Sequence, residues 1–337
     1  MKDGFKIMKR CKVCVLPETF PGITFDEAGV CNYCQKFKGQ KNLEEKKERA
    51  LQRFEKLIQE QRAKGTYDAL MCYSGGKDST YTLSLLRRNY GLDVLAVTYD
   101  NGFLPEQTLR NIRLVTDKLE MDHILYRPRF QVMKRIFSVC AEEDIYPPQT
   151  LMRASTICTS CMAIVKFSAL RMALEKDIPF VVFGWSPGQI PVASAIMKNN
   201  AEIIKVMQKG TFDPLYKLVG DGIRPYFLEE KHFDGSYSFP YNVSPLVFLD
   251  YNEEEILSEV SRLGWERPKD IDANTTNCLL NSFANVIHKE KHGFHPYVFE
   301  LAKLIREGYM TREEALRKLE EPENPQTVEA VREKLYR

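Results

Sequence analysis

Four cysteines near the start of the chain have the spacing of a metal site. They form two Cys-x2-Cys pairs, Cys11 with Cys14 and Cys31 with Cys34, separated by sixteen residues. Two such pairs can converge on one tetrahedral ion, and four thiolates leave no open position, so the site would be structural. We expect Zn2+ here, and an iron–sulfur centre or four unrelated thiols are the alternatives. Because the segment is too short for its own apolar core, the metal would supply its folding free energy.

A second motif with chemical potential is the segment Ser74–Ser79, of sequence SGGKDS. It follows the apolar run 69–73, which predicts a buried strand, and precedes residues 81–90, whose leucines recur with helical spacing. The turn therefore leads into a helix N-terminus, where free N–H groups, the helix dipole and two glycines favour a bound phosphate. The spacing differs from G-x4-G-K-[ST], which excludes a Walker-type site. The alternative is a tight turn without a ligand.

Three further cysteines could form another centre. Cys158 and Cys161 stand one turn apart at the predicted start of a helix, where the helix dipole favours the thiolate. Two thiolates in one turn can bind a metal or form a redox pair, and Cys278 could supply a third ligand. Cys72 and Cys140 are predicted core residues. We do not expect a disulfide framework, because nine cysteines is an odd number and the compartment is expected to be reducing.

The SGGKDS segment resembles the Ser-Gly-Gly-x-Asp-Ser fingerprint of the PP-loop pyrophosphatase family. Members cleave ATP between its α and β phosphates, adenylate a carbonyl oxygen and let a nitrogen or sulfur nucleophile displace AMP. The resemblance implies that the segment holds ATP and Mg2+, with Asp78 and Ser79 as catalytic residues. The nucleotide-binding residues it implies are Ser74, Gly75, Gly76, Lys77, Asp78, Ser79, Tyr99, Asp100, Gly184 and Trp185.

PP-loop tRNA sulfurtransferases hold a 4Fe-4S cluster with a Cys-x2-Cys pair and one remote cysteine. The arrangement of Cys158, Cys161 and Cys278 is similar, so the resemblance implies such a cluster here. The alternative is that Cys158 and Cys161 form a second zinc or thiol pair and that Cys278 is simply buried.

Strands that alternate with helices predict an α/β fold. The expected strands are 69–73, 93–99, 123–126 and 180–184, and the expected helices are 105–119, 130–140 and 158–176. This order predicts parallel βαβ units in a doubly wound, mostly parallel sheet of the PP-loop or HUP-like type. By analogy with related folds, adenine and ribose lie against the strand ends at Tyr99–Asn101 and Gly184–Ser186. An N-terminal zinc knuckle with four cysteine ligands and a C-terminal helical region complete the expected fold class.

We divide the chain into four regions. These are a zinc-knuckle region 1–40, a linker helix 41–64, a PP-loop ATP-binding α/β domain 65–250 with an insertion at about 200–242, and a C-terminal helical region 251–337. The linker is predicted to be amphipathic and to end at Gly65. Residues 211–242, rich in Gly, Pro, Asp and aromatic residues, are expected to form an irregular lid. Thr311–Glu314 matches a helix capping box.

The order of the motifs resembles one family more specifically. A Cys-x2-Cys-x2-Pro segment at 11–17, Pro-Gly-Ile at 21–23, Val-Cys-Asn-Tyr-Cys at 30–34, the PP-loop and Ile-Cys-Thr-Ser-Cys at 157–161 are similar to the N-acetyl sugar amidotransferases of bacterial surface-glycan pathways, including lipopolysaccharide O-antigen and flagellar glycans. The resemblance implies conversion of an acetamido group on a nucleotide-activated sugar into an acetamidino group, through an O-adenylated intermediate. Ammonia would come from separate glutaminase and cyclase-like subunits. Substrate contacts suggested by position alone are Arg153, Gln189 and Asn281.

Composition limits the other functional classes. The 48 Lys and Arg against 46 Asp and Glu give a net charge of +2, which does not favour a nucleic-acid partner. We find no run of about 18 apolar residues and no secretory signal near the start, so we expect a cytoplasmic enzyme without a membrane partner. His288 and His292 are expected to be surface or substrate-adjacent. A PP-loop tRNA sulfurtransferase and a nucleotide-binding scaffold without turnover are the alternative functions.

Overall fold

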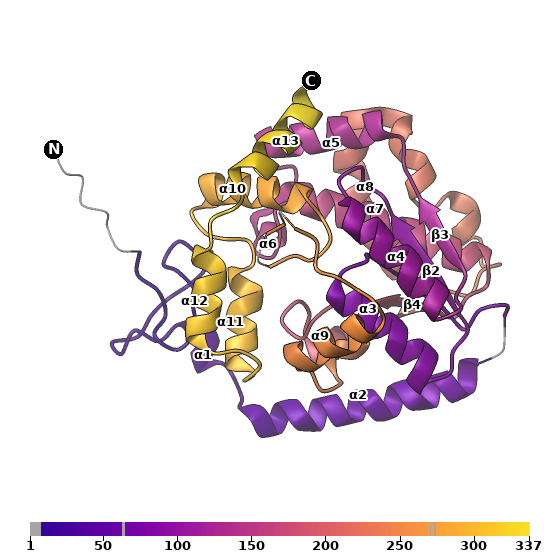
Figure 1. Cartoon of the computed structure of the whole chain (residues 1–337), viewed down its shortest axis with the longest axis horizontal. Helices are drawn as coiled ribbons and strands as arrows, with labels where there is room; N and C mark the ends of the chain where they lie inside the picture. The colour runs from indigo at the N-terminus through magenta and orange to yellow at the C-terminus, as the bar shows by residue number, and fades with distance from the viewer. Residues whose placement is uncertain (1–7, 63–64, 270, 273) are drawn as a thin grey trace.

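A mostly parallel sheet forms the centre of the fold (Figure 1). The computed structural model describes residues 8–62, 65–269, 271–272 and 274–337. Within these residues the sheet has six strands in the order β3-β2-β1-β4-β6-β5, all parallel except β5, which pairs antiparallel with β6. The strands are β1 Ala69–Cys72, β2 Val94–Tyr99, β3 His123–Tyr126, β4 Phe180–Phe183, β5 Ile196–Lys198 and β6 Tyr241–Val243. The predicted fold class is confirmed.

Helices cover both faces of this sheet. Alternate strand residues point to opposite faces, so Met71 of β1 packs in the layer of α2, α3, α4 and α9, whereas Leu70 packs against α7. The helices are α1 Asn32–Gln35, α2 Gln40–Gln61, α3 Lys77–Ser84, α4 Glu106–Lys118, α5 Phe130–Glu142, α6 Pro148–Leu151, α7 Thr156–Glu175, α8 Ala201–Val219, α9 Glu253–Arg262, α10 Leu280–His292, α11 Val298–Arg306, α12 Arg312–Glu320 and α13 Pro325–Tyr336. This layered arrangement is the doubly wound pattern.

Short helical segments join several of these elements. A π-helical turn, Leu85–Asn89, extends α3, and 3-10 turns occupy Val192–Ser194, Gly220–Tyr226, Glu230–Phe233 and Pro245–Val247.

The linker helix α2 ends earlier than expected. It runs from Gln40 to Gln61 along the lower edge of the molecule in Figure 1 and buries Phe54, Leu57 and Ile58 against the sheet layer. The backbone of Arg62 already leaves the helix, so Gly65 does not terminate it. The last two residues of the predicted helix, 63–64, lie outside the described residues.

The predicted irregular lid is partly helical. Residues 211–219 continue α8, and Pro214 lies inside that helix. Pro and Gly suggested a loop, but the Asn200 side chain accepts a hydrogen bond from the Ile203 N–H group and caps the helix, while Ile204 and Leu215 are buried. The irregular region begins only at Gly220.

Helix α7 corrects the expectation that no segment is long and apolar enough to span a membrane. By length and composition α7 passes that test, although half of its most apolar window is buried within the protein. It packs against β1 and β4 on one side and α5 on the other. Burial of this kind explains its apolar composition as that of a core helix.

The zinc-knuckle region packs against the C-terminal helices. Phe20 stacks on Phe299 of α11 with ring centroids 5.4 Å apart, and Arg312 of α12 donates to the carbonyl oxygens of Cys11 and Cys14. Figure 1 shows α11 and α12 beside this N-terminal segment. The predicted capping box begins α12, since Thr311 and Glu314 exchange both hydrogen bonds. Residues 11–34 and the helices α11 and α12 therefore form one packed unit.

Candidate active site

The SGGKDS turn joins β1 to α3 in the middle of the sheet. Gly75 has φ +76°, and a Cβ there would lie 2.8 Å from side-chain atoms of Thr108 and Ile112, so the turn requires glycine. The Gly75 carbonyl accepts a hydrogen bond of 2.8 Å from the buried Trp265 indole. Ser79 donates to the Gly76 carbonyl at 3.0 Å. The turn is thus held rigidly at the N-terminus of α3, as an anion site requires.

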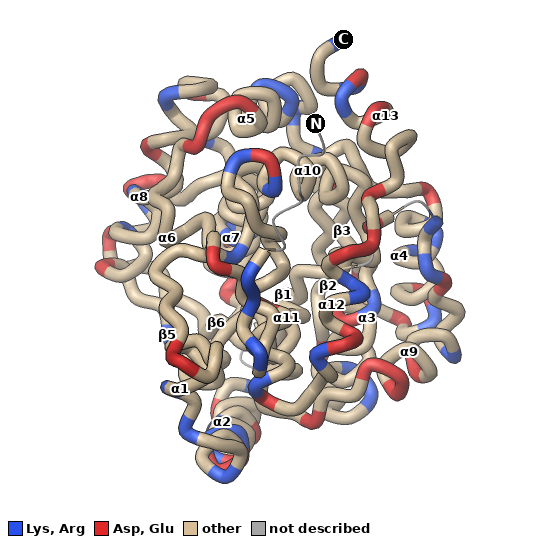
Figure 2. The backbone as a smooth tube through the Cα atoms, turned by 90° about the vertical axis from the view of Figure 1, so that its left-hand side faces the viewer, with Lys and Arg blue, Asp and Glu red and all other residues tan. Residues whose placement is uncertain are grey.

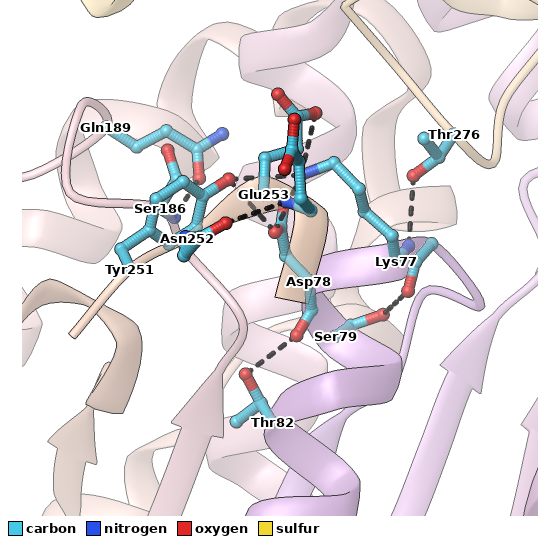
Figure 3. A network of polar contacts seen from close by, with 12 residues as sticks. Lys77, Asp78, Ser79, Thr82, Ser186, Gln189, Tyr251, Asn252, Glu253 and Thr276 are labelled. Atoms are coloured by element: carbon cyan, nitrogen blue, oxygen red, sulfur yellow. Dashed lines mark hydrogen bonds and ion pairs between the residues drawn. The ribbon is translucent and has the colours of Figure 1, made fainter. Parts of the chain in front are cut away.

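A cluster of charges lies directly beside this turn (Figure 3). The Lys77 ammonium is 2.8 Å from Asp78 Oδ1, 3.0 Å from the Tyr251 hydroxyl and 3.4 Å from Glu253 Oε1. Burial opposes the charge on Lys77, but these partners outweigh it and raise the Lys77 pKa. Burial also opposes ionisation of Glu253, but Lys77 and Lys318 outweigh it and lower the Glu253 pKa. The charged Lys77 ammonium therefore pairs with Asp78, the residue expected to contact ATP and Mg2+.

A polar segment that we did not predict covers the turn. The Thr276 hydroxyl accepts a hydrogen bond of 3.1 Å from the Lys77 N–H group, and Asn277 donates to the Ser74 carbonyl at 3.3 Å. A helix N-terminal N–H group is where a phosphate oxygen would bind, so the Thr276 hydroxyl takes the place of such an oxygen. The run of Asn and Thr before Cys278 was the only signal for this contact in the sequence.

Gly184 and Trp185, which were also predicted to bind nucleotide, follow β4 at the same edge of the sheet as the SGGKDS turn. Gly184 touches the backbone of Ser79: an added Cβ would lie 2.6 Å from the Ser79 Cα. Trp185 stacks on Phe183 at 4.7 Å, and the Lys166 ammonium lies 4.5 Å from the Trp185 ring centroid. Gly184 therefore allows the strand end and the turn to meet, while the Trp185 side chain packs on protein groups.

At the end of β2 the side chains face protein partners. Tyr99 packs against Tyr126 at 5.7 Å and donates to the Met133 sulfur. Asp100 is 4% exposed and pairs with Arg127 at 2.7 Å. Both side chains thus have protein partners in this structure, and their expected contact with nucleotide stays a prediction.

Asn101, the next residue, connects this strand end to the second group of cysteines. Its amide nitrogen lies 3.5 Å from the sulfurs of both Cys161 and Cys278, and the Asn281 amide lies 3.7 Å from the Cys158 sulfur. The fold thus brings the three distant thiols to one place. Their three sulfurs do not all lie within 4.8 Å of one another, whereas the thiolates around one tetrahedral zinc ion are about 3.8 Å apart. A cluster that gives each thiolate its own iron fits this wider spacing.

Burial has the largest effect on the pKa values of these three thiols. It raises the pKa of Cys158 to about 11 and also raises the pKa of Cys161 and Cys278. Burial thus opposes the thiolate that the helix N-terminus is expected to favour at Cys158. The helix also begins two residues earlier, at Thr156, with Ser155 accepting from the Cys158 N–H group.

The first four cysteines form a compact cluster. Their sulfurs all lie within 4.8 Å of one another, with 3.9 Å between Cys11 and Cys34 and 3.7 Å between Cys14 and Cys31. A tetrahedron with metal–sulfur bonds of about 2.3 Å has edges of about 3.8 Å, so the geometry fits zinc. Burial opposes ionisation of Cys11, but N–H groups of Cys14 and Cys31 outweigh it and lower the Cys11 pKa to about 7. These N–H groups are placed to stabilise a thiolate ligand.

Glu300 is a further residue that sequence reasoning missed. Its carboxylate comes from α11 and accepts a hydrogen bond of 2.9 Å from Ser186, at the end of β4. Burial raises the Glu300 pKa to about 7. Gln189 accepts from the Ser186 N–H group at 2.9 Å, and Arg153 donates to the Gln189 carbonyl. The C-terminal helices thus supply a titratable group to the strand ends.

A cavity and a buried histidine lie outside this candidate site. A cavity of about 570 Å3 lies at the opposite edge, lined in part by Asp93 and Asp122, which precede β2 and β3. Ligands of parallel α/β sheets bind at the carboxyl ends of the strands, so this cavity is not the candidate site. His288 is only 2% exposed, which corrects its expected surface or substrate-adjacent position.

A mostly parallel sheet with the SGGKDS turn at a helix N-terminus agrees with the resemblance to the PP-loop pyrophosphatase family that the sequence indicates. Residues 270–336 match the family described as LPS biosynthesis protein WbpG-like, C-terminal domain. This match covers the C-terminal segment and is in line with the resemblance to surface-glycan amidotransferases that the order of the motifs indicates.

The chain is also similar to several individual proteins. It is 23% identical over 321 residues to the uncharacterized protein MJ1599 of Methanocaldococcus jannaschii, covering 95% of this chain and 96% of that one. The U34-tRNA thiolase NcsA from Methanococcus maripaludis, solved with its [4Fe-4S] cluster, is 18% identical with a TM-score of 0.38, covering 94% and 91% of the two chains. NMN synthetase from Francisella tularensis is 13% identical with a TM-score of 0.37, covering 88% and 96%.

Proposed function

We propose that the chain is an ATP-dependent amidotransferase that converts the N-acetyl group of a nucleotide-activated sugar into an acetamidino group during bacterial surface-glycan synthesis. The observation that carries this proposal is the SGGKDS turn at the N-terminus of α3, which contains the Lys77–Asp78 ion pair and is contacted by Thr276 of the WbpG-like C-terminal segment. An anion site of this kind suits the diphosphate end of ATP. The substrate class, an N-acetyl sugar linked to a nucleotide, is proposed from the resemblance to the N-acetyl sugar amidotransferases.

Adenylation answers a chemical problem of the acetamido group. The amide carbonyl is a poor electrophile and its oxygen a poor leaving group, so transfer of AMP to that oxygen makes the carbon open to attack by ammonia. The amidine forms as AMP departs. Fixed N–H groups at the start of α3 would stabilise the departing diphosphate, and Mg2+ held by Asp78 would neutralise its charge.

The residues around the turn must rearrange when ATP binds. The Thr276 hydroxyl gives up the Lys77 N–H group to a phosphate oxygen, and the Lys77 ammonium moves from Asp78 toward the phosphates. Both bonds are replaced by bonds to ATP, which keeps the polar groups satisfied. Catalysis therefore includes a local opening of the segment 274–278.

Glu300 is the proton acceptor that we assign to the amination step. Attack by ammonia leaves a positively charged nitrogen that must lose a proton before AMP departs. A carboxylate with a pKa near 7 can accept this proton at neutral pH, and Ser186 orients it toward the strand ends.

Metal sites complete the proposal. Zinc held by Cys11, Cys14, Cys31 and Cys34 would stabilise the N-terminal fold. Cys158, Cys161 and Cys278 would hold a 4Fe-4S cluster, which would supply an iron without a protein ligand as a Lewis acid near the strand ends. Asn101 and Asn281 would donate to the ligand sulfurs of that cluster. Separate glutaminase and cyclase-like subunits would deliver the ammonia.

An isotope experiment tests the proposed function. The chain is incubated with MgATP, ammonium and a nucleotide-linked diacetamido sugar whose amide oxygens carry 18O, and the products are analysed by mass spectrometry. We expect an amidine product, equal amounts of AMP and diphosphate, and the label in AMP. Label in water or phosphate would contradict the adenylate.

A pair of Asp→Asn variants tests whether the SGGKDS turn carries the reaction. Asp78→Asn should lower turnover by roughly hundredfold or more, because it removes charge at the phosphates. Asp117→Asn, on the exposed face of α4, should behave as the unaltered chain. Equal loss in both variants would remove the special role of Asp78.

The two alternatives have direct tests. A tRNA sulfurtransferase would need clustered Lys and Arg, but blue and red segments are interspersed along the backbone in Figure 2 and the net charge is only +2. A salt-dependent gel shift with tRNA would nevertheless favour that function. A nucleotide-binding scaffold would bind ATP without forming AMP and diphosphate.

A further inference from the structure

Another group of metal-ligand side chains consists of residues other than those of the turn and the two sets of cysteines. Asp272, His295 and Glu323 each bring one ligand atom to a place where these atoms all lie within 4.8 Å of one another. Asp272 and His295 are 5% and 6% exposed, and the Glu323 side chain is 6% exposed. Two carboxylates and an imidazole therefore meet in a nearly dry environment.

Several polar atoms of this group have no hydrogen-bond partner. The Nε2 atom of His295 and the Oε1 atom of Glu323 are fully buried and unpaired, and they lie 3.8 Å apart. Asn274, whose N–H group donates to Asp272 at 2.8 Å, has an unpaired buried amide oxygen. Buried polar atoms nearly always have partners, so unpaired atoms that gather at one place indicate a missing ligand.

The charges point to the kind of ligand. Asp272 and Glu323 supply two carboxylates, and the Lys289 ammonium, 2.6 Å from Glu323 Oε2, balances only one of them. A buried excess of negative charge is costly unless a cation compensates it.

We propose that Asp272, His295 and Glu323 bind one divalent first-row metal ion, such as Mn2+ or Zn2+. Carboxylate oxygens with one imidazole nitrogen suit these ions, whereas the cysteine sites suit softer metals. The Asn274 amide oxygen is available as a further ligand. The Tyr297 N–H group donates to His295 Nδ1 at 3.2 Å, so binding through Nε2 moves the ring proton and ends that long bond.

The position of the three ligands indicates what the ion would do. Asp272 precedes α10, His295 lies between α10 and α11, and Glu323 lies between α12 and α13. All three belong to the WbpG-like segment 270–336. The ion would link three loops of this segment: the one before α10, the one between α10 and α11, and the one between α12 and α13. Residues 274–278, which cover the SGGKDS turn, follow the first of these ligands in the chain. The role of the ion is structural, and it positions the cover of the nucleotide site.

Metal analysis and Mn2+ titration of the full chain test this site without substrate or nucleotide. Asp272→Asn, His295→Gln and Glu323→Gln each remove one ligand, and Glu321→Gln, an exposed neighbour, is the matched control. Electron paramagnetic resonance measures free Mn2+, which binds thiolates poorly. Asp78→Asn is included to show that Mn2+ does not bind at the turn.

We expect the three ligand variants to purify with one ion fewer per chain or, where the site is purified empty, to bind Mn2+ at least about tenfold more weakly. Glu321→Gln and Asp78→Asn should match the unaltered chain. Added Mn2+ should raise the melting temperature of the unaltered chain and of Glu321→Gln, but not of Glu323→Gln, which separates lost binding from lost folding. The same metal content and Mn2+ affinity in all variants would overturn the proposal.

Discussion

Gly184 offers a sharp test of how β4 meets the SGGKDS turn. An added methyl group there would lie 2.6 Å from the Ser79 Cα, 2.8 Å from the Ser79 nitrogen and 3.1 Å from the Asp78 carbonyl carbon. All three are backbone atoms, so no side-chain rotation can relieve the contact. Ordinary carbon contacts need about 3.5 Å, so Gly184→Ala must separate the strand end from the start of α3 by about 1 Å.

This displacement sets the expected magnitudes. Overpacking of this kind costs about 1–3 kcal/mol of unfolding free energy, and we expect the upper half of that range because the obstacle is backbone. A displacement of about 1 Å at a site that positions phosphates can lower turnover by about hundredfold. Urea denaturation measures the first effect, and MgATP titration with turnover measures the second.

Gly210 provides the control. It lies inside α8 and has no heavy atom within 4 Å of an added Cβ. Gly210→Ala should stabilise the chain by about 0.5–1 kcal/mol, because alanine favours the helix, and should leave MgATP binding unchanged. If Gly184→Ala matched the unaltered chain in unfolding free energy and MgATP affinity, the close approach of β4 to α3 would be refuted.

Three other predictions follow from the same contacts. Cys31→Ser should abolish zinc binding and lower the melting temperature, whereas Cys140→Ser should keep the zinc content; metal analysis and thermal unfolding check both. Trp265→Phe leaves the Gly75 carbonyl without its buried donor and should cost about 1–3 kcal/mol by urea denaturation, with weaker MgATP binding; unchanged stability would count against the anchor. Glu300 has a folded-state pKa raised from 4.5 to about 7, so its contribution makes the chain less stable as pH rises between these values, by at most about 3 kcal/mol. Glu300→Gln should remove that part of the pH dependence, and identical pH profiles would contradict the raised pKa.

Most of the sheet could be predicted because its signals are local. The run 123–126 is β3 to the residue, and residues 69–73 and 180–184 each exceed their strands by one residue at the end. Apolar runs bounded by turn residues mark buried strands without knowledge of their neighbours. The start of α10 shows how tertiary contacts shift helix ends: the helix begins at Leu280, and the preceding Thr276 and Asn277 bond to the SGGKDS turn instead.

The surroundings of the site residues could not be predicted in the same way. Tyr99 and Asp100 follow a strand as nucleotide contacts should, yet Met133 and Arg127 engage their side chains. The exposed helix face expected around His288 is buried by packing. Such partners are distant in sequence, and only the folded chain determines which side chain faces which.

By itself the sequence determined the chemistry that is available: two cysteine pairs with zinc spacing, a glycine-rich turn before a helix, and the alternation of strands and helices. These depend on residue types a few positions apart, where bond geometry alone limits the conformations. The tertiary structure decided the rest. It placed Thr276 on the turn, Glu300 beside Ser186, Asn101 between two thiols, and Asp272 with His295 and Glu323. Contacts between residues so far apart along the chain arise only when burial of the apolar faces fixes how the helices pack on the sheet.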